Sequence, residues 1–434
     1  MSRGYLDTPI IYNLFPRLAG TLDRWPKHAE RALAMGFNWV FINPINYPGF
    51  SGSLYATKDY YRLNPVFLSG ASELSQLDAI SDTIRTIAAM GLHPIVDLVI
   101  NHTSKDSPLV QEHPCWYLRD HEGDVESPYA VDPDDPGKRT VWGDLAEIDN
   151  WNSQDRDALW SYWTQLVEEY LELGFDGFRC DAAYKVPSEL WSHLLGRARD
   201  IRPDVRFFAE TLGCTLEQTR ALRASGLHFF FNSSKWWDFE APWCLEQHRE
   251  FQDIPSISFP ESHDTERLSA ETDGNEAVQR LRYAFAAVFS AGVMMPIGYE
   301  YGFKKKLNVV TTSPEDWEQP SFDLTPFIAR VNSLKTGVSV LQGNGSLYML
   351  PLTSGHVIAL ERRSQRDPSE GSWVIINKNR EGQGVFHTST LIVPGGFDRM
   401  LRLCKDDMPP DGETVPDQIT LDPSELVLIT SKVL

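Results

Sequence analysis

Short, continuously apolar segments alternate with longer segments of helical periodicity over the first three quarters of the chain. The apolar segments expected to form strands are 10–15, 38–42, 94–100, 177–180, 205–209, 228–231, 257–259 and 293–295. Helical patterns lie between them, for example from Leu22 to Met35 and from Ser72 to Met90. Continuous apolar strands that alternate with helices are typical of a parallel sheet covered on both faces.

Eight such repeats predict an α/β fold built on a closed (β/α)8 TIM barrel. A doubly wound open sheet is the structural alternative. The barrel is favoured because no glycine-rich phosphate loop follows the first strand.

The alternation breaks in two places. Residues 103–153 are polar and rich in turn-forming residues, and they follow the third strand directly, where the active-site loops of a barrel lie. From about residue 340, short apolar segments punctuated by Gly, Pro and Asp predict a small antiparallel β domain. We therefore expect a catalytic barrel formed by residues 1–102 and 154–339, an inserted region at 103–153, and a C-terminal β domain at 340–434.

Composition narrows the class of partner. With 40 Lys+Arg against 60 Asp+Glu, the net charge of −20 repels nucleic acid and anionic membranes. The five cysteines are odd in number and widely spaced, which argues against a disulfide framework. Neither a secretory pattern at Met1–Tyr5 nor an apolar run of about 20 residues is found. We expect a cytoplasmic protein with no membrane partner.

Carboxylates stand in or at the end of four of the apolar segments. They are Asp97, Asp181, Glu210 and Asp264. Cleaving an acetal requires one group that protonates the leaving oxygen and another that attacks or stabilises a cationic carbon. The pattern indicates glycosidic chemistry if these strand ends converge.

Two of these carboxylates have informative neighbours. Arg179 lies two residues before Asp181, so both side chains share one face of a strand, and the arginine should keep the carboxylate ionised, as a nucleophile requires. Glu210 follows the apolar Phe207–Ala209, which should raise its pKa and suit it to proton donation. The structural alternatives are a plain salt bridge inside a barrel and a glutamate at a helix start.

Two histidines also stand at strand ends near acids. His102 follows Asp97 by five residues, and His263 directly precedes Asp264. A histidine near neutral pH can donate hydrogen bonds to sugar hydroxyls without a fixed charge.

Together these segments resemble the signature regions of the alpha-amylase family, glycoside hydrolase family 13. The four matching segments are Asp97–His102, Gly177–Asp181, Phe208–Glu210 and Ser262–Asp264. Tyr55–Pro65 resembles the family's segment whose tyrosine floors the cleaved sugar, and Gly292–Pro296 resembles its eighth strand.

The resemblance implies roles for individual residues. Asp181 would be the nucleophile, Glu210 the acid/base, and Asp264 the third acid, which holds hydroxyls and distorts the ring. The positions implied to bind substrate are Tyr55, Asp97, His102, Arg179 and His263, with Tyr184 and Lys185 on the leaving-group side. The mechanism would be a retaining double displacement through a covalent glycosyl-enzyme, with carboxyl groups about 5–5.5 Å apart.

The chain also departs from the family pattern. The usual Lys-His pair after the nucleophile is Tyr184-Lys185, and the asparagine often found before His-Asp is Ser262. Asn101 fits the family's calcium-coordinating position, so calcium is compatible with the sequence, although no cofactor is required.

Three functions remain open. The first is hydrolysis of α-1,4-glucosidic bonds in an α-glucan or maltooligosaccharide. The second is glycosyl transfer, because Leu14–Arg17 resembles bacterial maltosyltransferases of the same family, which use a phosphorylated maltosyl donor. The third is a non-catalytic family member, which characteristically lacks an acid of the triad, whereas all three acids stand here.

Overall fold

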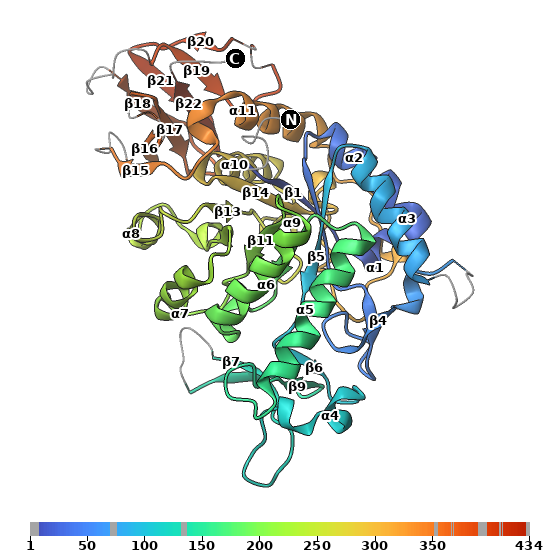
Figure 1. Cartoon of the computed structure of the whole chain (residues 1–434). Helices are drawn as coiled ribbons and strands as arrows, with labels where there is room; N and C mark the ends of the chain where they lie inside the picture. The colour runs from blue at the N-terminus through green and yellow to red at the C-terminus, as the bar shows by residue number, and fades with distance from the viewer. Residues whose placement is uncertain are drawn as a thin grey trace.

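The computed structural model describes residues 8–430, except 70–75, 132–136, 351–354, 366, 368, 389–396, 408 and 410. Eight parallel strands close into a barrel in the order β1-β14-β13-β12-β11-β10-β5-β2 (Figure 1). The strands are β1 (Ile10–Leu14), β2 (Trp39–Ile42), β5 (His93–Leu98), β10 (Gly177–Cys180), β11 (Arg206–Ala209), β12 (Phe229–Phe231), β13 (Ser256–Ser258) and β14 (Gly292–Pro296). The predicted TIM barrel is confirmed, and the open doubly wound sheet is excluded.

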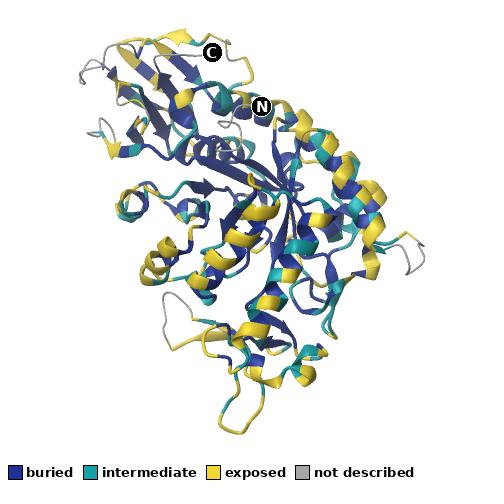
Figure 2. Cartoon of the chain, in the orientation of Figure 1, coloured by how far each residue is buried: buried dark blue, intermediate teal, exposed yellow. Residues whose placement is uncertain are grey.

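An outer layer of helices surrounds the barrel, and most of them turn a buried, largely apolar face inward (Figure 2). The main helices are α2 (Trp25–Ala34), α3 (Gln76–Ala89), α5 (Arg156–Leu173), α6 (Ser188–Ile201), α7 (Leu216–Ala221), α8 (Trp243–Glu250), α10 (Glu276–Phe289) and α11 (Thr325–Gly337). The helix predicted from Ser72 begins outside the described residues, and its described part is α3.

The barrel interior is a packed apolar core at the level of the strands. It contains Ile11, Trp39, Phe41, Ile95, Phe208, Phe229, Phe231, Ile257, Phe259 and Met294. One strand pair approaches closely at Gly177, where a Cβ would lie 2.1 Å from the carbonyl oxygen of Arg206, so only glycine fits. This tight packing holds β10 and β11, the strands that precede Asp181 and Glu210, in a fixed register.

The inserted region after β5 consists of short elements. β6 (His102–Ser104) pairs with β9 (Leu145–Glu147), and β7 (Tyr129–Val131) pairs with β8 (Arg139–Val141). A helix, α4 (Leu109–Glu112), lies between them in sequence, and part of the predicted inserted region, 132–136, lies outside the described residues.

A second hairpin, which the sequence pattern did not predict, is formed by β3 (Asn46–Pro48) and β4 (Thr57–Leu63). Tyr55 lies on the connection between these strands.

The C-terminal part is antiparallel, as predicted. Its main sheet has the order β15-β16-β17-β22-β19-β20, and a smaller sheet pairs β18 with β21. The strands are β15 (Ser346–Met349), β16 (Val357–Arg363), β17 (Gly371–Asn377), β18 (Gly384–His387), β19 (Arg399–Arg402), β20 (Glu413–Thr414), β21 (Gln418–Leu421) and β22 (Leu426–Thr430). In Figure 1 this domain lies at the end of the molecule opposite the inserted region.

Two fully buried cations join the C-terminal domain to the barrel. Lys335 of α11 donates to the carbonyls of Ala287, Ser290 and Leu341 at 2.7, 2.8 and 3.0 Å. Arg362 of β16 donates to carbonyls that include that of Val288 at 2.9 Å. Both side chains therefore satisfy carbonyl groups at the C-terminal end of α10 that would otherwise be left unpaired.

Within the described part of the chain, no helix is both long and apolar enough to cross a bilayer.

Candidate active site

One guanidinium, that of Arg179, gathers all four predicted carboxylates. Its Nη1 lies 2.8 and 3.0 Å from the two oxygens of Asp97 and 2.6 Å from Oδ1 of Asp181. Its Nη2 lies 3.6 Å from Oε2 of Glu210 and 4.0 Å from Oδ2 of Asp264. The acids, which come from four segments far apart in sequence, thus meet at the C-terminal mouth of the barrel.

The register of the barrel explains why Arg179 is central. Arg179 is the direct partner of Asp97 in the β10–β5 pair, and Asp181 is two residues further along on the same face. The side chain of Arg179 is only 4% exposed, so its charge is balanced by these carboxylates rather than by water. The neighbouring carboxylates hold the pKa of Arg179 well above its ordinary value.

Glu210 has the protonation behaviour of a general acid. Burial raises its pKa to about 8, and the negative charges of Asp181 and Asp264 act in the same direction against the lowering effect of Arg179. The prediction that the surroundings of Glu210 raise its pKa is confirmed. A carboxyl group that remains protonated at neutral pH can deliver a proton to a leaving oxygen.

The backbone after Asp181 is bent toward Glu210. Ala182 has φ 39° and ψ 51°, in the left-handed region that non-glycine residues rarely adopt. In this conformation its N–H donates to Oε2 of Glu210 at 2.7 Å. The strained turn therefore couples the two predicted catalytic carboxylates through the backbone.

Tyr55 and His263 form the second half of the site. The Tyr55 hydroxyl donates to Oδ2 of Asp97 at 2.6 Å, and it lies 2.6 Å from Nε2 of His263. Because the single hydroxyl hydrogen goes to Asp97, the hydrogen between Tyr55 and His263 must come from Nε2. Burial lowers the pKa of His263 to about 4, which keeps the ring neutral with its proton on Nε2.

The same Nε2 lies 3.1 Å from Oδ2 of Asp264, and the rings of Tyr55 and His263 stack with centroids 5.7 Å apart. His102 supports this group from the other side, since its Nε2 donates to the carbonyl of Tyr55 at 3.0 Å. Burial lowers the pKa of His102 as well. The structure therefore places Tyr55, His102 and His263 together with the acids.

Sequence reasoning missed two asparagines at the ends of β1 and β2. Nδ2 of Asn43 donates to the Tyr55 hydroxyl at 3.0 Å, and Asn13 donates to Oδ1 of Asn43 at 2.8 Å. Both asparagines are fully buried, and together they hold the Tyr55 hydroxyl in position. Their position at strand ends, the same signal that singled out the acids, could have found them.

A buried ion pair that sequence reasoning also missed positions the loop of Asp264. Arg267 contacts Oε1 of Glu261 at 2.7 Å and donates to the carbonyl of Ile297 at 2.9 Å. Oε2 of Glu261 accepts from the N–H of Leu268 at 2.6 Å. The loop between β13 and α9 (Leu268–Glu271) is thereby attached to the loop after β14.

Lys185 lies on the inserted side of the site. Its Nζ donates to the carbonyl of Tyr129 at 3.1 Å and lies 3.3 Å from Oε1 of Glu147. These contacts join the end of β10 to β7 and β9 of the inserted region. Tyr184 is partly buried beside them, and burial raises its pKa.

Asn101 meets one requirement of a calcium ligand. Its Oδ1 is buried and has no hydrogen-bond partner in the structure. Calcium takes six to eight oxygen ligands, from carboxylates, amides, carbonyls and water. Within the described residues no group of three or more His, Cys, Asp or Glu side chains is placed to hold a metal ion.

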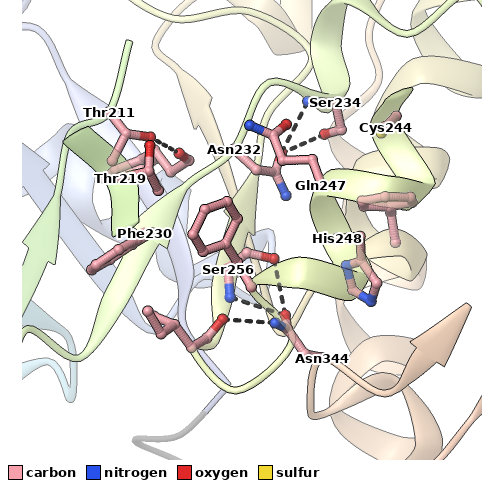
Figure 3. A pocket seen from close by; sticks show the side chains of 14 residues that line it. Thr211, Thr219, Phe230, Asn232, Ser234, Cys244, Gln247, His248, Ser256 and Asn344 are labelled. Atoms are coloured by element: carbon pink, nitrogen blue, oxygen red, sulfur yellow. Dashed lines mark hydrogen bonds between the residues drawn. The ribbon is translucent and has the colours of Figure 1, made fainter. Parts of the chain in front are cut away.

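A separate cavity of about 40 Å³ lies outside the barrel between β12 and α8 (Figure 3). Several of its polar groups are bonded to the protein: Asn344 accepts from the N–H of Ser256, and Thr211 donates to the carbonyl of Phe231. None of the four acids lines this cavity. Its lining therefore packs the strands behind the site and takes no part in the acid cluster.

Comparison with known proteins agrees with this geometry. The family model described as glycogen debranching enzyme, glucanotransferase domain, matches residues 6–120. An α-1,4-glucan:maltose-1-phosphate maltosyltransferase of Burkholderia pseudomallei is 27% identical over 406 residues, covering 90% of this chain and 35% of that protein. The corresponding protein of Myxococcus xanthus is 25% identical, covering 84% of this chain and 58% of its own length. The chain thus spans between about a third and three fifths of these relatives.

Among solved structures, an alpha-amylase from Lactobacillus plantarum superposes with a TM-score of 0.76 at 20% identity, covering 99% of this chain and 100% of that one. The structure is thus a (β/α)8 barrel with a cluster of acids at its C-terminal mouth. More specifically, the chain is similar to members of the alpha-amylase family, glycoside hydrolase family 13, and among them to maltosyltransferases.

Proposed function

We propose that this protein is an enzyme that cleaves α-1,4-glucosidic bonds of an α-glucan or maltooligosaccharide with retention of configuration. The observation that carries the proposal is the convergence of Asp181, Glu210 and Asp264 on the guanidinium of Arg179. Three carboxylates from different strand ends around one guanidinium include the groups that acetal cleavage needs.

The proposed chemistry has two steps. In the first, an oxygen of Asp181 bonds to the anomeric carbon while the glycosidic bond breaks and Glu210 gives its proton to the leaving oxygen. In the second, Glu210 takes a proton from water or an acceptor hydroxyl, whose oxygen displaces Asp181. Asp264 would hold hydroxyls of the same sugar ring, His263 would line the ring beside Asp264, and Tyr55 would form its floor.

Glycosyl transfer is the second candidate, and the similarity to the maltosyltransferases favours it. The basic run Lys304–Lys306, which could contact a phosphate group, supports transfer less strongly. Lys306 lies 2.8 Å from Oε1 of Glu266, and Lys305 pairs with Asp316, so both charges are matched by carboxylates. Hydrolysis and transfer share the first step, and they differ in which hydroxyl reaches the glycosyl-enzyme.

We also propose that the reaction needs no cofactor and takes place in the cytoplasm, without nucleic-acid or membrane partners. All five cysteines are free thiols in the structure, which supports a reducing compartment. The net charge of −20 disfavours anionic partners. If calcium binds, the oxygen available to it is Oδ1 of Asn101, which does not contact the acids that break the bond.

Product analysis tests the reaction. Maltoheptaose is incubated with the protein, with and without maltose 1-phosphate, and the products are separated by chromatography. Shortened sugars alone indicate hydrolysis, whereas longer chains that depend on maltose 1-phosphate indicate transfer. In either case, Asp181→Asn should lower the rate by at least about 10⁴-fold. Wild-type turnover that this substitution leaves intact would contradict the assigned nucleophile, and no turnover at all would favour the non-catalytic alternative.

A further inference from the structure

A hollow of about 450 Å³ lies at the N-terminal ends of the barrel strands, opposite the acid cluster. Its barrel wall is formed by Arg199 of α6, Arg206 at the start of β11, and His228 just before β12. Its other wall is the segment 342–345 and the turn at Ser364 and Gln365 of the C-terminal domain.

Hydrogen-bond donors converge on this barrel wall. The backbone N–H of Phe207 donates to Nδ1 of His228 at 3.0 Å, which places the proton of the neutral ring on Nε2. Nη2 of Arg199 lies 3.0 Å from that same Nε2. A guanidinium has no acceptor, so in this contact two N–H groups face each other.

The barrel wall of the hollow is positively charged, although the chain as a whole is strongly negative. Two arginines line it in a protein whose net charge is −20. Burial and the charges of Arg206 and Arg199 lower the pKa of His228 to about 3, so the ring stays neutral and keeps only its Nε2 proton. A carboxylate, Glu370, stands near the rim, where it accepts from the hydroxyl of Ser339 at 2.6 Å.

We propose that this hollow is a binding site for a tetrahedral oxyanion, either free phosphate or the phosphate group of a small sugar phosphate. An anionic oxygen can accept from both Nη2 of Arg199 and Nε2 of His228, which resolves the donor–donor contact between them. Arg206 adds positive charge to the same wall. The volume lies within the range of small-ligand pockets and admits a phosphorylated monosaccharide beside the anion.

The site is distinct from the acid cluster and does not depend on the proposed reaction. It lies at the junction of the barrel and the C-terminal domain, so an occupant would contact both. We expect binding to stabilise the folded protein in proportion to ligand concentration.

Calorimetric titration of the full chain with inorganic phosphate, and separately with glucose 6-phosphate, tests the proposal. Saturable binding is expected, with affinity that falls as sodium chloride is added. Arg199→Gln and Arg206→Gln should each weaken it about tenfold. Arg199 is exposed, so its substitution should not disturb folding. Arg197→Gln is the matched control, because Arg197 is on the same helix but pairs with Glu168 and Asp200.

The outcomes separate the ligand sources and the competing explanations. Tighter binding of glucose 6-phosphate than of phosphate would identify a sugar phosphate as the occupant, whereas equal binding would identify the free anion. Three results would overturn the proposal: no saturable binding of either probe, equal binding by wild type and both pocket variants, or displacement of the anion by excess maltotetraose, which would place it in the acid cluster.

Discussion

Arg179 is the residue on which the geometry of the acid cluster depends. A charge buried to this extent is costly unless it is paired, and here Asp97 and Asp181 both lie within hydrogen-bonding distance of it. The two predicted catalytic carboxylates, Asp181 and Glu210, differ in their surroundings. Asp181 lies 2.6 Å from the guanidinium of Arg179, whereas Glu210 lies 3.6 Å from it. Unequal surroundings of this kind give one acid the role of nucleophile and the other that of proton donor.

The pKa of Glu210 leads to a pH prediction. The first step needs Glu210 protonated, and burial raises its pKa to about 8. We therefore expect kcat/KM toward maltooligosaccharides to fall as pH rises through about 8, because the free enzyme loses this proton. A rate profile between pH 5 and 10 measures the alkaline limb.

Glu210→Gln provides the matching test of the proton-donor role. The substitution should lower kcat/KM for maltoheptaose about 10³-fold or more and should remove the alkaline limb. With an aryl maltoside, whose leaving group departs without protonation, the substitution should lower the rate of the first step much less. Equal losses on both substrates would argue that Glu210 acts through structure alone.

At the scale of single residues, the sequence identified the acids because each stands at the end of an apolar strand. The same rule applied to Asn13 and Asn43 would have found the pair that holds Tyr55. The backbone of Ala182 could not be predicted, since an alanine in the left-handed region carries no signal in sequence. Nor could the partners of Lys185, because Glu147 and Tyr129 reach it only through the folded inserted region.

At the scale of elements, strands buried on both faces were predictable, and elements with mixed faces were not. Each barrel strand was found to within one or two residues because its apolar run is continuous. β4, with the sequence TKDYYRL, and α8, with the sequence WCLEQHRE, went unpredicted because both are mostly polar. The inserted region followed the same rule, since its strands are three residues long and too short to show a period.

Lys185 is the contact through which the inserted region meets the end of β10. Lys185→Met removes the bonds to Glu147 and Tyr129, so we expect the β7–β8 hairpin to loosen. KM for maltoheptaose should rise about tenfold, with a smaller change in kcat. The reason is that the hairpin contributes to binding of the sugar and not to cleavage of the bond. Steady-state kinetics measures the split between the two constants.

Limited proteolysis supplies a second readout for that variant, since a loosened inserted region should be cut faster than in wild type. Lys405→Met is the control, because Lys405 pairs with Asp422 at the surface of the C-terminal domain. A variant at Lys185 with unchanged KM and unchanged cleavage would show that the bonds to Glu147 and Tyr129 do not hold the region.

At the scale of the whole molecule, the C-terminal domain is attached through buried cations rather than through apolar packing alone. Lys335 is fully buried, and its three donors satisfy three carbonyls. Burial lowers the pKa of Lys335, because the charged form is removed from water. The three bonds to the carbonyls offset part of that cost.

We expect Lys335→Met to lower the free energy of unfolding by about 3 kcal/mol, since three buried carbonyls lose their partner. Urea denaturation measures the loss, and separate unfolding transitions for the barrel and the C-terminal domain would show that the junction has weakened. Arg363→Met, at an exposed position next to Arg362, should leave the stability unchanged. A Lys335 variant as stable as wild type would contradict this account of the junction.

Closure of the barrel has a consequence for how the protein matures. The side chains around Arg179 come from segments that span residues 97 to 264, so no fragment that ends before β13 can hold the complete set. Secondary structure can form segment by segment, but catalytic competence must arrive in a single late event, when the first and last strands join. The time course of recovered activity during refolding therefore reports when the barrel closes. It should lag behind the recovery of the circular dichroism signal of the helices.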